Sequence, residues 1–338
     1  MTKSIPASRK NAALPRETWA ANSRNVRSVS HSNTIAASSP AIAGLFRVPA
    51  HGTARTIAAV RRLDEDLVDW GGNGPLVHFA HANGFPPGTY RRLLEPLSGR
   101  ARVITWLAPP LRERWRPEAV RSWRDLAGEL VATLRRHGVR GAVGAGHSLG
   151  AVLTAMAAVR APELFSSLVL FDPVWLDPLR GLFWRLALAT GLADRIHPVR
   201  TARGRRAWWP DRETARRAWA RKRAFRRWAP GVLEDYVACG LVADPAGGVR
   251  LAYPPEWEHR VFRLVPPDPW REVRELRLPT LVVRGERSDT LLPPAVAYLR
   301  RVAPAVRVVE LPGVGHFVPM EAPRRCLELL VEQLGRRG

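Results

Sequence analysis

The sequence alternates short apolar runs with longer segments of helical periodicity, and this alternation restricts the possible folds more than any other feature. Six runs rich in β-branched and aromatic residues have the character of buried strands. They lie at 76–80, 101–106, 141–145, 167–171, 280–284 and 306–311. Helical patterns lie at 90–97, 122–137, 151–161, 293–302 and 322–334. Alternating strands and helices predict an α/β fold with a doubly wound, mostly parallel central sheet that helices cover on both faces.

The alternation is interrupted once, between Asp172 and Arg277, where about a hundred residues lack a convincing strand pattern. A structureless loop of that length is implausible in a compact domain, so this segment is predicted to be a folded, largely helical insertion. The predicted organisation is a core of 56–172 and 276–338 with an insertion of 173–275. Residues 1–55 are rich in Ser, Ala and Arg and predict a disordered basic extension. An organelle transit peptide or a mis-assigned start would have the same composition, and we favour the latter.

Composition limits the class of protein. The formal net charge of +23 is typical of nucleic-acid binders, but only three of the 53 basic residues are lysines. Such an arginine bias throughout the chain favours a GC-rich genome over a nucleic-acid partner. Two cysteines are too few for a disulfide scaffold, which predicts a cytoplasmic location. Residues 141–159 come nearest to a membrane span, but their glycines and a His-Ser pair argue against one.

Ser148 lies in the segment Gly146-His-Ser-Leu-Gly150, where a predicted strand meets a predicted helix. One interpretation is a dinucleotide-binding turn, with Asp172 closing the next strand at a suitable distance. Leu149 argues against it, because the third glycine of that motif must be small for close helix–strand packing. The alternative is the G-x-S-x-G turn, in which flanking glycines let the backbone bend sharply and expose the serine hydroxyl. We adopt this second interpretation.

A serine hydroxyl is a weak nucleophile and needs a general base that a carboxylate orients. His316 and Asp289 each follow a predicted strand, and the order Ser, Asp, His is the one used with this serine turn. Carboxyl ends of parallel strands share one edge of a sheet, so all three side chains are expected at that edge. Asp172 is the rival acid, because it follows the strand at 167–171. We favour Asp289.

His81-Ala-Asn-Gly-Phe-Pro86 follows the first predicted strand. With the serine turn and the two loops, it makes the chain resemble the α/β-hydrolase family from about residue 65 to the C-terminus. The resemblance implies an oxyanion hole formed by the backbone N–H groups of Phe85 and Leu149. It also implies that residues 173–275 form a helical cap over the site, and that neither a cofactor nor a metal is required.

The resemblance predicts a serine hydrolase that cleaves a carboxylic ester of a small, apolar acyl substrate through an acyl-enzyme on Ser148. C–C bond hydrolysis, thioester hydrolysis, acyl transfer and a non-enzymatic binding role on the same fold remain open. The segment 196–228 is strongly basic, which indicates arginines pointing to solvent, an anionic membrane surface as partner, or a mouth for acidic substrates. Nucleic acid is not expected as a partner, and the sequence does not predict an oligomeric state.

Overall fold

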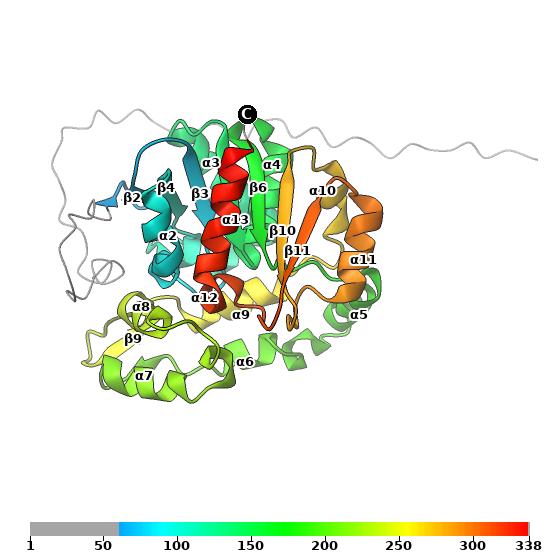
Figure 1. The fold of residues 1–338 in the computed structure, drawn as a ribbon. Coiled ribbons are helices and arrows are strands. Elements are labelled where there is room, and N and C mark those ends of the chain that lie inside the picture. The colour runs from blue at the N-terminus through cyan, green and yellow to red at the C-terminus, as the bar shows by residue number, and fades with distance from the viewer. Residues whose placement is uncertain (1–60, 337–338) are drawn as a thin grey trace, which may run out of the picture. The chain divides into compact units, whose positions relative to one another are not determined.

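The computed structural model describes residues 61–336, and its main feature is an eight-stranded sheet (Figure 1). The strand order is β1-β2-β4-β3-β5-β6-β10-β11, in which only β2 runs against its neighbours. The strands are β1 (Arg61–Arg62), β2 (Leu67–Gly71), β3 (Leu76–Ala80), β4 (Arg102–Trp106), β5 (Ala142–His147), β6 (Phe165–Phe171), β10 (Thr280–Gly285) and β11 (Arg307–Leu311). The central strands are parallel, so their carboxyl ends lie along one edge of the sheet.

Helices pack on both faces of this sheet. In Figure 1, α2 (Arg91–Ser98) and α13 (Pro323–Gly335) lie in front, and α3 (Trp123–Arg136) and α4 (Leu149–Arg160) lie behind. Two further helices, α10 (Trp270–Glu275) and α11 (Pro293–Val302), continue the rear layer, because α10 contacts both α4 and α11. The short α12 (Val318–Glu321) precedes α13, and 3-10 turns complete the core. These turns are η2 (Pro87–Tyr90), η3 (Pro109–Leu111), η4 (Pro117–Ala119) and η5 (Pro162–Leu164).

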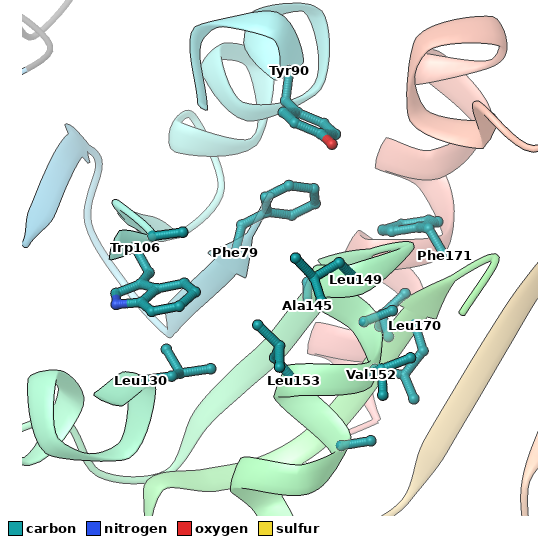
Figure 2. Close-up of a cluster of buried hydrophobic side chains, with 14 of the residues drawn as sticks. Phe79, Tyr90, Trp106, Leu130, Ala145, Leu149, Val152, Leu153, Leu170 and Phe171 are labelled. Atoms are coloured by element: carbon teal, nitrogen blue, oxygen red, sulfur yellow. The ribbon is translucent and has the colours of Figure 1, made fainter. Parts of the chain in front are cut away.

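The core is continuous through the middle of the sheet (Figure 2). Phe79 of β3 packs against Tyr90 on one face, with a ring-centroid distance of 4.7 Å. On the other face, α4 is almost entirely buried, and Leu149 and Leu153 point into the cluster that Figure 2 draws. Because both faces of the central strands are covered, the strands read as apolar runs without alternation.

The predicted α/β fold is confirmed, and so is each of the six strands and five helices, within a few residues. Ser122 forms a capping box with Asp125 at the start of α3, and Gly138, with φ of +65°, follows its end. The two strands that the sequence did not predict are β1, at the edge of the sheet, and β2, next to it. The two-residue β1 is too short for any hydrophobic period to identify it.

The segment between β6 and β10 contains helices and a small sheet. Its helices are α5 (Pro178–Ala189), α6 (Val199–Arg203), α7 (Arg212–Ala220), α8 (Val232–Gly240) and α9 (Pro255–Arg263), with 3-10 turns η6 (Leu192–Arg195) and η7 (Arg223–Phe225). Three short strands form a separate antiparallel sheet in the order β7-β9-β8: β7 (Trp208–Trp209), β8 (Leu241–Ala243) and β9 (Val249–Leu251). Strands of two or three residues are too short to show a hydrophobic periodicity, so the sequence did not predict them. We call residues 173–269 the cap, because α10 packs with the core helices.

The predicted basic extension, residues 1–55, lies outside the described residues. Within residues 61–336, no helix is both long and apolar enough to cross a membrane.

Candidate active site

Ser148 occupies a strained turn between β5 and α4. Its φ of +54° and ψ of −115° are rare for a residue with a side chain. The flanking glycines explain why this turn can form. A Cβ on Gly146 would lie 2.5 Å from the Gly150 carbonyl oxygen, and one on Gly150 would lie 2.1 Å from the Ala80 carbonyl oxygen. Only glycine lets the helix approach the sheet this closely, which aims the hydroxyl out of the carboxyl edge.

His316 connects the serine to a carboxylate. Its Nε2 lies 3.0 Å from Ser148 Oγ and accepts a hydrogen bond from the hydroxyl group. Its Nδ1 lies 2.7 Å from Oδ2 of Asp172 and donates a hydrogen bond to it. The serine is 8% exposed and the aspartate is completely buried, so the hydrogen-bonded chain runs inward from the surface. This is the geometry in which a histidine can remove a proton from a serine and keep the resulting charge stabilised.

Asp172 is held in place from several directions. It follows β6 directly and has a φ of +44°, so its backbone turns sharply as it leaves the sheet. Its Oδ1 accepts from the Gly285 N–H at 3.2 Å, and its Oδ2 accepts from the Ser288 hydroxyl at 2.5 Å. A buried carboxylate is costly unless its lone pairs are satisfied. Here the β10 loop supplies two of the donors, and His316 supplies the third.

The prediction that Asp289 contacts His316 is wrong, and Asp172 holds that position. The Asp289 side chain is exposed and accepts a hydrogen bond from the neighbouring Thr290 hydroxyl at 3.3 Å. The physical reason is that β6 and β10 are neighbours, so their loops reach the same part of the edge. Ser288, one residue before Asp289, is buried, and its hydroxyl turns toward Asp172. The sequence contained no signal for this role of Ser288.

A second buried relay reaches His316 from the opposite side. The Ala82 N–H donates to the Tyr90 hydroxyl at 2.9 Å, and that hydroxyl donates to Nδ1 of His147 at 2.9 Å. His147 Nε2–H donates to the backbone carbonyl of His316 at 3.0 Å. Burial and then the neighbouring His316 lower the pKa of His147 well below its usual value, which keeps the ring neutral. His147 therefore packs beside the serine, as expected, while Tyr90 was missed.

The two predicted oxyanion donors lie in different segments. Leu149 directly follows Ser148, and Phe85 lies in the loop after β3. Leu149 is the first residue of α4, so its N–H has no partner within the helix. Phe85 closes a turn by donating to the Ala82 carbonyl at 3.3 Å, with Gly84 at φ of +82°. The hydrogen bond from the Phe85 N–H to the Ala82 carbonyl is long and therefore weak, so this N–H can also donate to a stronger acceptor.

The cap is bonded directly to this turn. Tyr253 donates its hydroxyl to the Asn83 side-chain oxygen at 2.7 Å, and the Asn83 amide donates to the Glu258 carbonyl at 3.1 Å. Arg205 bridges the Glu258 carboxylate at 2.5 Å and the Tyr236 hydroxyl at 2.6 Å. Burial alone would lower the pKa of Arg205, but Tyr236 and Glu258 raise it above its usual value. The cap thus contributes buried polar contacts that hold the turn of Asn83–Phe85.

Aromatic side chains from the core and the cap meet beside the site. Phe85 belongs to the turn after β3 and Phe317 follows His316, and their ring centroids lie 5.3 Å apart. Trp228 of the cap lies 5.8 Å from Phe85 and 5.7 Å from Phe317. Together with Phe225, Trp228 also lines a shallow groove of about 540 Å³ in the cap. The surroundings of the site are therefore largely apolar.

The described residues offer no cluster of three or more His, Cys, Asp or Glu side chains that could hold a metal ion. Both cysteines, Cys239 and Cys326, are buried thiols, and burial raises the pKa of each, to about 12 for Cys239. The reactive groups that the structure brings together at this edge are Ser148, His316 and Asp172.

A sheet in this order, a serine on a strained strand-to-helix turn and an insertion after β6 together define the α/β-hydrolase class of proteins. Comparison with protein families agrees. Residues 79–329 match the model of the alpha/beta hydrolase family, so the chain belongs to that family of hydrolases. The predicted resemblance is confirmed at the level of family and fold.

Individual relatives are distant. The chain is 27% identical over 267 residues to 2-(acetamidomethylene)succinate hydrolase of Mesorhizobium japonicum, covering 77% of this chain and 87% of that protein. The crystal structure of E-2-(acetamidomethylene)succinate hydrolase superposes with a TM-score of 0.69 at 23% identity, covering 82% and 98% of the two chains. An esterase of M. tuberculosis gives a TM-score of 0.61 at 23% identity, with coverage of 80% and 88%. These structural likenesses establish the fold alone.

Proposed function

We propose that the chain is a serine hydrolase that cleaves carboxylic esters through an acyl-enzyme on Ser148. The observation that carries the proposal is the unbroken hydrogen-bonded chain from Asp172 through His316 to Ser148. Family membership supports a hydrolase, and the strained turn supports a serine as the attacking group.

In the proposed reaction, Ser148 Oγ attacks the acyl carbonyl carbon while His316 Nε2 removes the hydroxyl proton. Asp172 orients His316 and stabilises the imidazolium that forms. The N–H groups of Phe85 and Leu149 donate to the developing oxyanion, and the N-terminus of α4 favours the same negative charge. One such donor contributes about 3 kcal/mol to transition-state stabilisation. His316 then protonates the leaving alkoxide, and water releases the acyl group by the reverse sequence.

The substrate class follows from the surroundings of the site. Phe85, Phe317 and Trp228 present apolar surface beside the serine. The nearby cation Arg205 is already bonded to Glu258 and Tyr236, so it does not call for an anionic substrate. Both observations support a neutral ester with an apolar acyl group. Thioester and C–C bond hydrolysis and acyl transfer use the same groups, and matched thioesters distinguish the first of these from ester hydrolysis.

A second candidate is an acyl compound that carries a carboxylate. Arg227 of the cap reaches the loop of His316, since a Cβ on Gly315 would lie 3.0 Å from its guanidinium. Its Nε lies 3.4 Å from Glu321, a long ion pair, and the side chain is 43% exposed. The relative in Mesorhizobium japonicum is named for a succinate, which is consistent with an anionic substrate. Arg227→Gln would then raise KM for a hemisuccinate ester and leave KM for the neutral ester unchanged.

The direct test is labelling with a fluorophosphonate probe, which reacts with activated serines. The parent protein is expected to be labelled, and Ser148→Ala is expected to abolish labelling while Ser98→Ala leaves it intact. Labelling that persists in Ser148→Ala would refute the nucleophile. A screen of aryl esters of increasing acyl length, with matched thioesters and lactones, then identifies the bond that is cleaved.

A further inference from the structure

Helix α5 of the cap carries an exposed apolar stripe. Leu179, Leu182, Phe183 and Leu186 are 61%, 50%, 62% and 52% exposed. Their spacing of three, one and three residues places them on one face of the helix. Two more exposed apolar residues, Leu192 and Ile196, follow directly in the chain. Of the seven large apolar side chains that are exposed in the described residues, these are six, so the exposure is concentrated in one segment.

The opposite face of α5 is the one that anchors the helix to the protein. Gly181, Trp184 and Ala187 are buried, and the Trp184 indole N–H donates to the Val265 carbonyl at 2.8 Å. Gly181 permits close contact, since a Cβ there would lie 2.2 Å from the Pro267 carbonyl oxygen. The outer stripe is therefore not needed to hold α5 in place. A helix that is apolar on its outer face as well needs a second apolar environment.

The charges around the stripe are predominantly positive. Residues 178–203 contain five arginines and a single acid, Asp194. His259 contacts the Asp194 carboxylate at 2.9 Å, and Arg263 also pairs with it. Arg185, Arg195, Arg200 and Arg203 are all exposed. Arginines that flank an apolar helical face are typical of segments that lie in the interface of anionic lipid.

A second copy of the chain is the other obvious occupant. A two-fold contact through α5 would bring the same arginines of both copies together, which like-charge repulsion disfavours. Anionic lipid headgroups would instead pair with them. A lipid contact at the arginines of 196–228 was one of the alternatives that the sequence left open, and within that segment Arg216 and Arg217 of α7 pair with Glu213.

We propose that α5 and the residues after it, 178–196, form a peripheral binding surface for anionic lipid membranes. The stripe of Leu179, Leu182, Phe183 and Leu186 inserts among the acyl chains, and the flanking arginines contact the headgroups. The surface adjoins the candidate active site, because Arg180 donates to the Thr290 carbonyl at 3.0 Å and Thr290 belongs to the loop of Ser288. This proposal goes beyond the proposed hydrolysis and does not depend on it.

The test is flotation of the full chain with vesicles of phosphatidylcholine and phosphatidylglycerol at 7:3, compared with pure phosphatidylcholine. At low salt the parent is expected to bind the anionic vesicles and to bind less as salt is added. Leu182→Gln with Phe183→Gln is expected to reduce partitioning by about tenfold or more, since glutamine preserves the helix but loses apolar burial. Arg185→Gln is expected to reduce it about fivefold.

Trp208→Gln is the matched control, because Trp208 is the one large apolar side chain among residues 61–336 that is exposed outside this segment, at 45% exposure. It is expected to float as the parent does. Thermal unfolding and hydrolysis of a short soluble ester should be unchanged in every variant, which separates this proposal from the proposed function. A parent that does not float, or a double variant that floats equally well, would overturn the proposal. So would a concentration-dependent dimer that the double variant abolishes without any vesicle binding.

A site-specific probe gives a second readout. Both native cysteines are buried, so Leu182→Cys introduces an accessible thiol for an environment-sensitive dye. Its emission is expected to shift to the blue on adding anionic vesicles. The same dye on Arg324→Cys of α13, whose native side chain is 94% exposed, should not shift. Equal shifts at both positions, or none at Leu182→Cys, would contradict insertion through α5.

Discussion

The loops after β6 and β10 leave neighbouring strands at the same edge of the sheet, and each carries an aspartate. Asp172, in the first loop, is completely buried and accepts hydrogen bonds from Gly285, Ser288 and His316. Asp289, in the second, is exposed and accepts from Thr290. The difference arises from distance along the chain. Asp172 is the first residue after β6, whereas Asp289 lies four residues beyond β10 and has turned to the surface.

The sequence suggested that the β10 loop supplies the carboxylate, through Asp289, whereas in the structure the β6 loop supplies it, through Asp172. The β10 loop contributes its backbone N–H and the Ser288 hydroxyl, both of which point inward, while the β6 loop contributes the carboxylate. A buried carboxylate requires donors from more than one segment, so the pair of loops acts as one unit.

The largest expected effect distinguishes the two aspartates directly. Asp172→Asn should lower kcat by about 10⁴, because the amide no longer holds His316 in the tautomer that accepts from Ser148. Asp289→Asn should leave kcat within about twofold. Steady-state kinetics on the same ester, with folding checked by circular dichroism, measures both. The reverse ranking would reject Asp172 as the orienting acid.

The next effect concerns the junction of β10 with its loop. A Cβ on Gly285 would lie 2.1 Å from the Gly315 carbonyl oxygen, next to His316, so the backbone must move. Gly285→Ala should cost about 2–3 kcal/mol in the free energy of unfolding and also reduce kcat. Urea unfolding measures the loss of stability. The control is Gly204→Ala, where the added methyl group meets no heavy atom within 4 Å and should change stability by less than about 0.5 kcal/mol.

A smaller effect separates the two hydroxyls of the β10 loop. Ser288→Ala removes the donor to Asp172 and the acceptor for the Thr290 and Leu291 N–H groups, and should cost about 1–2 kcal/mol in stability. It should also lower kcat about tenfold, because Asp172 loses one of its fixed donors. Thr290→Val removes the contact with exposed Asp289 and should have little effect on either quantity. Similar losses of stability and kcat in both variants would contradict the conclusion that the contact with buried Asp172 matters more than the contact with exposed Asp289.

The smallest expected effect concerns His78, which is buried like Asp172 but has no hydrogen-bond partner. Both ring nitrogens of His78 are buried and unpaired, and burial lowers its pKa from 6.5 to about 3. The folded state keeps His78 neutral while the unfolded state takes up a proton below pH 6.5. The contribution of neutral His78 to the free energy of unfolding is therefore fully present above pH 6.5 and is lost as the pH falls toward 3. His78→Leu should reduce the loss of unfolding free energy between pH 7 and 5.5 by about 1 kcal/mol. An unchanged pH dependence would contradict this.

Much of the site was predictable from local sequence. Gly146 and Gly150 around Ser148 indicate a turn that only glycines allow, and His316 follows a recognisable strand. Tyr90 and Ser288 were not predictable, because their roles depend on partners 57 and 116 residues away in the chain. The short strands of the cap were missed for a different reason: two or three residues contain no period to detect.

The sequence by itself determined the alternation of strands and helices, the serine turn and the edge of the sheet where the side chains meet. These depend on residue type and on spacing within one element, so neighbouring residues are enough to specify them. Only the tertiary structure decided which aspartate faces His316, how the cap holds the turn of Asn83–Phe85 and which face of α5 remains uncovered. Each depends on the direction in which a side chain leaves its loop or helix and on what packs against it. That direction results from contacts between segments far apart in the chain.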